Sequence, residues 1–304
     1  MYSFTTQRTL YGNLSNDASA VNLTLGDILM NDSLRQILSG RRWKFLEKTK
    51  TLSTVASQQA YVLPSDFLWL DGLRVTIGTT VYRPIEIHSR EQWDRINMFS
   101  GTSDIPQYFF IFNGSLQLFP TPASSTANAI TFVYVRRQKD LSVADYTTGN
   151  ILTATNGSAA IVGTGTTFTA AMVGRWLRIT DSDTANKGDG EWYQIASYTS
   201  ATAITLETLY NGTSISSGTA AYAIGQVSLL PEAFQALPVY KALVHYFTSV
   251  KPDQLKSKLY NDMYVNLFSD MEASEAGKSN NNVLNRGIYY APMENPNNFP
   301  GVIS

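Results

Sequence analysis

A change in composition near Tyr146 constrains the fold of this chain more than any other feature of its sequence. From about Tyr146 to Gln226 the chain is rich in Thr, Ala, Ser and Gly, has few charges, and contains short apolar runs separated by turn residues. Short strands at such spacing are typical of a small β-sandwich or β-barrel. The flanking segments, strands before and helices after, need each other to bury their apolar faces. We therefore predict a β domain over residues 146–225, inserted into a core that both ends of the chain build.

Helical spacing of apolar residues appears near both ends of the chain. The first such segment begins at Thr24, a suitable N-cap, and is predicted to end at Gly40. The second follows the sequence LLPEAF, and Pro238 predicts a kink or a restart there. A further stripe at near four-residue steps is predicted to end at Gly277 and consists of Leu255, Leu259, Met263, Leu267 and Met271.

Strand signals dominate between Gln59 and Arg137. The sequence Asn113-Gly114, between QYFFIF and SLQLFP, predicts a tight β-hairpin turn. Ser89 and Gln92 stand in capping-box spacing and predict a short helix. The fold class is therefore α+β: a helical-bundle and β core from residues 1–145 and 226–277, the inserted domain, and an extended tail over residues 278–304.

The predicted tail has no apolar period and many Asn and Pro residues, so it cannot form a core of its own. It nevertheless carries Tyr289, Tyr290 and Phe299. Aromatic side chains are common anchors at protein interfaces, so these three residues are candidate contacts with a partner.

The sequence RRWKFLEKTK contains the one basic cluster of the chain, with Glu47 as its only acid. Arg41, Arg42 and Lys44 begin it, and Lys48 and Lys50 follow. Three interpretations remain open: a solvated helix end, an interface with an acidic neighbour, or a contact with phosphate groups.

Charge and residue usage argue against several function classes. The 23 basic and 24 acidic residues give a formal net charge of -1, which lacks the electrostatic footprint of a protein that grips nucleic acid by its phosphates. Cysteine is absent, so disulfides, thiolate metal sites and cysteine nucleophiles are excluded. The N-terminus shows neither a signal peptide nor an apolar run that could span a bilayer, and we expect a cytosolic site of synthesis with no membrane contact.

Candidate catalytic or metal-binding residues are few. His88 and His245 belong to no spaced metal motif, and we expect His245 to pack on the apolar helical stripe and His88 to lie at an exposed edge. The loop DSDTANKGDGEW, from Asp181 to Trp192, gathers acids but departs from the EF-hand pattern at several positions, so a hairpin tip is favoured over a calcium site. We expect no enzyme activity, cofactor or metal.

Several motifs of turn and packing residues occur in a fixed order along the chain. They are YVLPSD at Tyr61–Asp66, PQY at Pro106–Tyr108, the Asn113-Gly114 hairpin followed by Leu118-Phe119-Pro120 and Pro122, and Leu230-Pro231-Glu232. In this order the chain resembles the head–tail adaptor proteins of tailed bacteriophages, also called connector or tail tubular protein A-like proteins. The resemblance covers about residues 20–140 and 226–275.

This resemblance implies a structural virion protein at the head–tail junction, assembled in the host cytoplasm. About twelve copies would form a ring between the portal protein and the tail tube or nozzle, and duplex DNA would pass through the channel without specific binding. Subunits would pack helix against helix, and the C-terminal tail would reach the portal. A near-neutral subunit suits this role, because many phosphate contacts would hold the DNA in place.

An alternative function is a tail-associated module whose inserted β domain recognises a host surface glycan. Trp176 and Trp192 motivate this alternative, because aromatic faces stack on sugars. Burial in the core of the inserted domain is the simpler expectation for both tryptophans.

Overall fold

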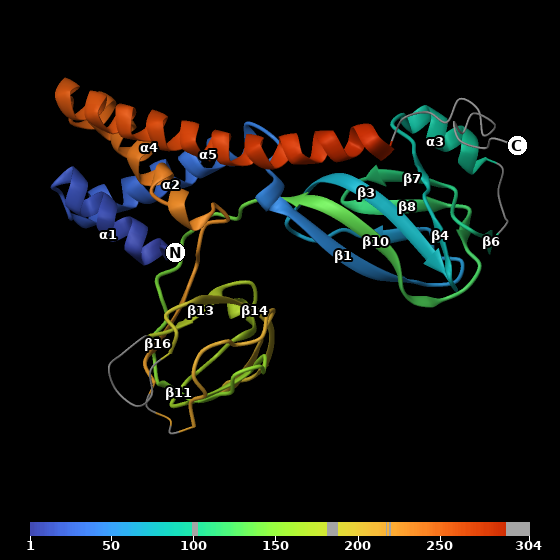
Figure 1. Cartoon of the computed structure of the whole chain (residues 1–304), viewed down its shortest axis with the longest axis horizontal. Coiled ribbons are helices and arrows are strands. Elements are labelled where there is room, and N and C mark those ends of the chain that lie inside the picture. The colour runs from blue at the N-terminus through green and yellow to red at the C-terminus, as the bar shows by residue number, and fades with distance from the viewer. Residues whose placement is uncertain (99–102, 181–187, 217, 219, 290–304) are drawn as a thin grey trace, which may run out of the picture.

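The computed structural model describes residues 1–98, 103–180, 188–216, 218 and 220–289, with only the backbone described at residue 103 and over 276–289. Figure 1 shows three parts: a bundle of helices, a β core beside it, and a separate barrel-like domain below. The predicted α+β fold class is confirmed.

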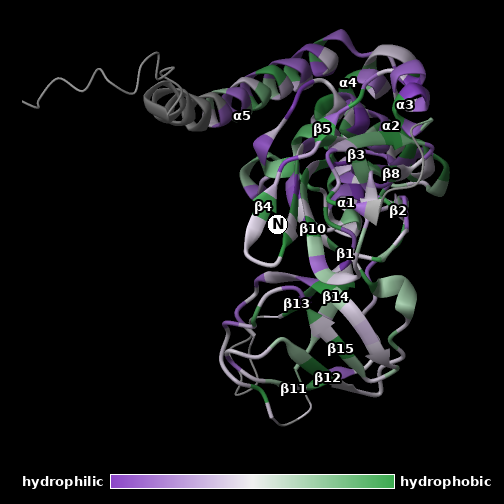
Figure 2. Cartoon of the chain, turned by 90° about the vertical axis from the view of Figure 1, so that its right-hand side faces the viewer, coloured by the Kyte–Doolittle hydropathy of each residue, from purple (hydrophilic) through white to green (hydrophobic). Residues whose placement is uncertain are grey.

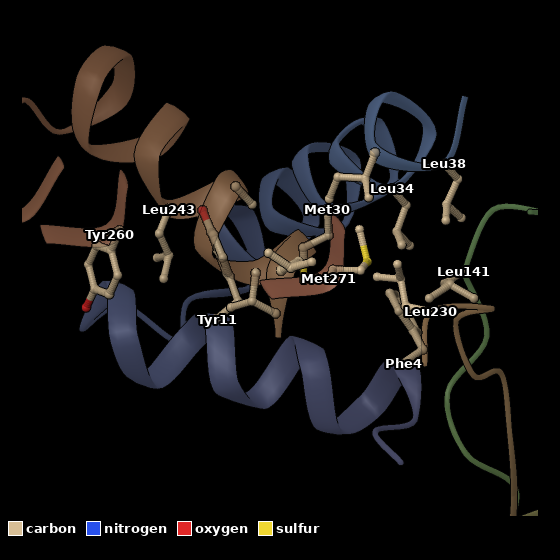
Figure 3. Packing of buried hydrophobic residues seen from close by; sticks show 14 of the residues in the cluster. Phe4, Tyr11, Met30, Leu34, Leu38, Leu141, Leu230, Leu243, Tyr260 and Met271 are labelled. Atoms are coloured by element: carbon tan, nitrogen blue, oxygen red, sulfur yellow. The ribbon is translucent and has the colours of Figure 1, made fainter. Parts of the chain in front are cut away.

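The helical bundle combines segments from both ends of the chain. Its main apolar cluster contains residues from Phe4 to Leu46 together with residues from Leu230 to Met271. Figure 3 shows side chains from these distant segments, including Tyr11, Met30 and Leu243, converging on one space. The helices are α1 (Phe4–Ser15), α2 (Ala20–Ser39), α4 (Leu237–His245), a π-helical turn (Tyr246–Val250) and α5 (Gln254–Tyr289).

The first helix was not predicted, and the second begins earlier than predicted. Ser3 caps α1 by accepting a hydrogen bond from the Thr6 amide, and Ser19 caps α2 in the same way from Asn22. The short polar side chain of Ser is well suited to this position, so Ser19 is the N-cap of α2, and Thr24 lies within the helix. Pro238 lies at the first turn of α4, as expected for a helix restart.

Helix α5 corrects two expectations about the C-terminal region. It continues past Gly277 to Tyr289, so residues 278–289 are helical and not extended. A helix tolerates an interior glycine at a cost of about 1 kcal/mol, and α5 contains two, Gly277 and Gly287; the first proline beyond them is Pro292. The remaining part of the predicted tail, residues 290–304, lies outside the described residues.

The predicted apolar stripe of α5 does not lie on one face. Leu255, Leu259 and Met263 are 84%, 55% and 38% exposed, whereas Met271 is fully buried. A helix turns by about 100° per residue, so each four-residue step advances the side chain by about 40° around the axis. Four such steps carry the stripe from the solvent to the core.

Two sheets, mostly antiparallel, form the β core. The first sheet has the order β1-β10-β3-β4, and the second has the order β2-β8-β7-β5 with a parallel β5–β7 pair. Buried residues of both sheets, such as Tyr61, Phe109 and Phe132, form a second apolar cluster. The bounds are β1 (Glu47–Thr54), β2 (Ala60–Val62), β3 (Phe67–Ile77), β4 (Thr80–Tyr82), β5 (Ile85–Glu86), β7 (Tyr108–Phe112), β8 (Ser115–Phe119) and β10 (Thr126–Arg136). A small parallel pair joins β6 (Ser103–Asp104) to β9 (Thr121–Pro122).

Two local predictions for the β core are confirmed. Asn113 and Gly114 both have positive φ and connect β7 to β8 as a two-residue turn. The short helix α3 (Arg90–Asn97) follows Ser89, although the Ser89 side chain makes no capping hydrogen bond. Trp93 of α3 stacks on Phe110 with ring centroids 5.6 Å apart, which holds the helix on the sheet.

The strands between Asn150 and Gly225 form a small barrel with its own apolar cluster. Six strands follow in the order β11-β12-β15-β14-β13-β16. The bridges Tyr146–Ile224, Ile151–Ala220 and Ala154–Ile215 connect the two edges of this sheet, so it closes on itself. The strands are β11 (Asn150–Ala154), β12 (Ala160–Thr164), β13 (Trp176–Ile179), β14 (Trp192–Ser200), β15 (Ala203–Leu206) and β16 (Tyr222–Gly225). Figure 2 shows β13 and β14 on the side of the barrel that faces β1 and β10.

Candidate assembly surfaces

The basic cluster lies where the bundle, the β core and the barrel meet. Trp43 and Leu46, within the cluster, are each only 1% exposed and belong to the core of the bundle. The Trp43 indole Nε1 donates to the Ile37 carbonyl at 3.0 Å, which ties the cluster to the end of α2. Arg41 and Arg42 lie just past the end of α2 and are partly exposed, whereas the chain from Glu47 onward is strand β1, so a helix end describes only the start of the cluster.

Arg41 and Arg42 pair with acids of two other elements. The Arg41 Nη1 atom lies 2.8 Å from Glu272 Oε1 of α5, and its guanidinium also lies 4.8 Å from the centre of the Trp43 ring. Arg42 forms an ion pair with Asp71 of β3. Both arginines stay partly exposed, and such pairs contribute at most about 1 kcal/mol each. They orient the junction more than they stabilise it.

Lys44 and Lys48 extend these contacts to α5 and to the barrel. The Lys44 amide donates to Glu275 Oε2 at 3.1 Å, and Glu275 is only 5% exposed. The Lys48 Nζ atom lies 2.9 Å from Glu207 Oε1, just after β15. Burial, with Asp71 nearby, raises the pKa of Glu47, the single acid of the cluster. The cluster therefore contacts all three parts of its own subunit.

A shallow cleft of about 280 Å³ separates the β core from the barrel. The Lys48–Glu207 pair lies within it, next to Trp176. Its lining residues are Lys48, Arg136, Trp176, Gln194, Glu207 and Thr208. Trp176 is half-buried there. Trp192 is only 9% exposed, and the Arg178 guanidinium lies 6.0 Å from the centre of its ring, but Trp192 does not belong to the apolar cluster of the barrel.

The remaining candidate chemical groups do not converge. His88 is exposed, as expected, and its Nδ1 lies 3.8 Å from Glu86, but His245 is also exposed, at the end of α4, and does not pack on the apolar stripe. In the acidic loop, Asp189 accepts hydrogen bonds from the Tyr193 hydroxyl and the Glu191 amide, while Asp181 and Asp183 lie outside the described residues. Among the described residues, no cluster of three or more His, Asp or Glu side chains could hold a metal ion.

Comparison with protein families accounts for the motifs of turn and packing residues. Residues 6–156, about half of the chain, match the model of the SU10 adaptor protein family. The chain belongs to this family of phage head–tail adaptors. No curated protein matches the chain.

The match runs from α1 of the adaptor through the β core to β11 of the barrel. It includes α1, which sequence patterning missed. The motif residues have structural roles within this region: Tyr61 is 5% exposed, and its hydroxyl donates to the Gln58 carbonyl at 3.1 Å. Asp66 accepts from the Tyr134 hydroxyl at 3.0 Å. These contacts fix the strand ends of the β core.

The predicted C-terminal contact residues are only partly visible. Tyr289 is the last residue of α5 in the adaptor, and Tyr290 and Phe299 lie outside the described residues. In both views α5 extends beyond the other helices of the bundle (Figures 1 and 2). None of the helices in the described part of the chain is long and apolar enough to cross a bilayer.

Two helices of the adaptor also present apolar side chains to solvent. On α5 these are Leu255, Leu259 and Met263, and on α2 they are Val21 and Ile28 at 82% and 62% exposure. Sequence periodicity indicated both helices and placed Leu255, Leu259 and Met263 on one apolar stripe, whereas Val21 lies before the predicted start of α2. Only the packing of α2 and α5 on α4 shows which sides remain uncovered.

Proposed function

We propose that this adaptor forms a ring of about twelve copies between the portal protein and the tail tube or nozzle, and that duplex DNA passes through its channel. The observation that carries the proposal is the family match over residues 6–156. Apolar side chains of α2 and α5 are exposed, and soluble monomers rarely leave such faces uncovered. This exposure supports a ring in which neighbouring copies cover these faces.

Charge also supports passage of DNA without specific binding. The net charge is -1, and several cations of the one basic cluster pair with acids of the same subunit. A protein that neutralises few phosphates releases few counterions and gains little affinity for DNA. Duplex DNA can then slide past the ring.

The contacts with other virion proteins are assigned as part of this proposal. Tyr289, Tyr290 and Phe299 would dock on the portal. The exposed parts of Arg41, Arg42 and Lys44 would face an acidic surface of a neighbouring protein. Assembly would take place in the host cytoplasm and leave the adaptor at the head–tail junction of the virion.

A phage that carries a nonsense codon in this gene tests the proposal. We expect infected cells to accumulate heads and tails that are not joined, and the chain supplied from a plasmid to restore joined particles. Electron microscopy of the lysate gives the count of each particle type. Joined, infectious particles in the absence of the chain would contradict the proposal.

Recognition of a host glycan remains the second candidate, and the cleft at Trp176 favours it. The half-exposed indole lies beside Gln194, Glu207 and Thr208, a combination of an aromatic face and hydrogen-bonding groups that suits a sugar ring. A glycan array probed with the full chain and with the Trp176→Ala variant tests it. Signals that the substitution abolishes would support this function, and an array without signals would exclude it.

A further inference from the structure

The exposed apolar residues of α2 lie on the side of the helix that faces away from α4. Met30 and Ile37 are buried in the same apolar cluster as α4, and Gly26 packs against Tyr11 of α1. Val21 and Ile28 are seven residues, or about two turns, apart, so they lie almost in line along the helix. We call Val21 and Ile28 the α2 stripe.

The exposed residues of α5 occupy a second, separate face of the bundle. Tyr260 and Met271 are buried on the side of α5 that packs towards α4. Leu255, Leu259 and Met263 lie in the first half of the helix on another side, and we call them the α5 stripe. Helix α4 packs against both α2 and α5, so the two stripes belong to two different neighbours of the same helix.

Charges beside the two stripes differ in sign on balance. On α5 the exposed Lys256 and Lys258 outnumber Asp262, which lies beside Met263, and on α2 Arg35 is paired with Asp140. Asp32 lies one turn beyond Ile28 on α2, where Gln36 donates to its carboxylate at 2.6 Å. Lys258 lies next to Leu259 on α5 and is exposed. Within the part of the subunit that the structure describes, neither Asp32 nor Lys258 forms an ion pair. An acid beside one apolar stripe and a base beside the other favour contact between the two stripes.

We propose that the α5 stripe of one copy packs on the α2 stripe of the next copy, with Lys258 facing Asp32. The inference rests on the proposed function and names the surfaces that join the ring. Because the two surfaces differ, each copy keeps one free stripe after pairing, and repeated addition closes a ring. Pairing of one stripe with itself would stop at a dimer and leave the other stripe exposed.

Two variants, each with one stripe disrupted, test this arrangement. The first is Leu255→Glu with Leu259→Glu, and the second is Val21→Glu with Ile28→Glu. All four positions are more than half exposed, so the variants should fold, and circular dichroism with thermal unfolding verifies this. Val62→Glu, at 81% exposure on β2 and away from the bundle, is the matched control.

The measurement is the mass distribution of each protein at its highest soluble concentration, by native mass spectrometry. The wild type and the control should form the same oligomer, and each double variant should associate about 100-fold more weakly, since each buried Leu, Val or Ile side chain contributes about tenfold or more. A 1:1 mixture of the two double variants should give a dimer with one copy of each, because one intact stripe remains on each partner.

Three results would overturn the inference. They are oligomers of wild-type size formed by either double variant, a mixture that forms no mixed dimer, and a wild-type chain that stays monomeric at its highest soluble concentration. The nonsense-codon experiment is independent of these results. If the nonsense-codon phage gives unjoined heads and tails while the double variants still form oligomers, the proposed function stands. The ring interface then lies on another surface of the subunit.

Discussion

Gly26 lies in α2 at the point where the ring of Tyr11 packs on the helix. A Cβ atom at Gly26 would overlap the ring carbons of Tyr11, which is fully buried. Overpacking costs about 1–3 kcal/mol, and the better helix propensity of Ala returns about 1 kcal/mol. We expect Gly26→Ala to lower the free energy of unfolding by up to about 2 kcal/mol.

Urea unfolding measures this change, and Gly72→Ala is the control. Gly72 lies in β3, and a Cβ atom there would meet no atom within 4 Å. The control should therefore change the free energy of unfolding by less than about 0.5 kcal/mol. Equal effects of the two substitutions would contradict the account of α1–α2 packing.

Glu275 offers a second test at the scale of single residues. It is 5% exposed and accepts from the Lys44 amide at 3.1 Å, whereas Glu272 pairs with Arg41 at the surface. Glu275→Ala leaves a partly buried amide without that acceptor, so we expect a loss of about 1–3 kcal/mol in urea unfolding. Glu272→Ala should cost at most about 1 kcal/mol. A larger loss for Glu272→Ala than for Glu275→Ala would show that this ranking is wrong.

The basic cluster shows what the sequence could and could not predict for single residues. The density of Arg and Lys indicated a special surface, but not the acids that meet it: Glu272, Asp71 and Glu207 lie in α5, in β3 and after β15. Partners so far apart in the chain come together only through the tertiary fold, and no local spacing encodes them. Hydrophobic periodicity likewise identified α5 but not the side that its neighbours cover.

At the scale of elements, strands rich in aromatic and β-branched residues were predictable, and α1 and β1 were not. The hairpin at Asn113-Gly114 depends on local backbone preferences, so its sequence sufficed. Strand β1 has the sequence EKTKTLST, and its polar residues suit an edge strand that only β10 pairs. In α1 only Phe4 and Tyr11 are large apolar residues that are buried, too few to produce a clear helical period.

The barrel should lose stability in alkaline solution. Burial raises the pKa of Tyr193 to about 12, with the hydrogen bond to Asp189 adding to it, and burial raises the pKa of Tyr210 to about 12 as well. In the unfolded chain the tyrosine side chains have a pKa of about 10. The folded form therefore binds more protons between these values, and its stability should fall as the pH rises from about 10 to about 12.

Urea unfolding at several pH values, followed by tryptophan fluorescence, measures this loss. Tyr193→Phe should reduce the loss of free energy of unfolding over this pH range, because Phe has no proton to lose. A slope that stays the same in the variant would contradict the assigned role of Tyr193.

The end of α5 gives a prediction about partner contacts. Removal of residues 290–304, which follow the last described residue of the helix, should leave the thermal unfolding of the protein unchanged and abolish docking on the portal, because Tyr290 and Phe299 are lost. The double substitution Tyr290→Ala with Phe299→Ala in the full chain should weaken docking in the same direction. Light scattering of the mixture with portal rings measures it, and undiminished docking of the truncated chain would reject this role.

At the scale of the whole molecule, the α+β class followed from the sequence because both ends of the chain carry apolar faces that need each other. The main apolar cluster does join residues 4–46 to residues 230–271. The position of the barrel beside β1 and β10 was not predictable, since it depends on contacts such as Lys48–Glu207 across the junction. The surfaces proposed to form the ring were not predictable either, because the packing of the bundle decides which sides of its helices stay exposed.

The central claim is that this adaptor assembles as a ring on the portal. The most direct test is the mass of the purified protein, alone and mixed with the portal protein of the same phage, by native mass spectrometry. We predict a discrete complex with about twelve adaptor copies on each portal ring. A protein that remains a monomer or a trimer and does not bind the portal would contradict the claim and favour glycan recognition instead.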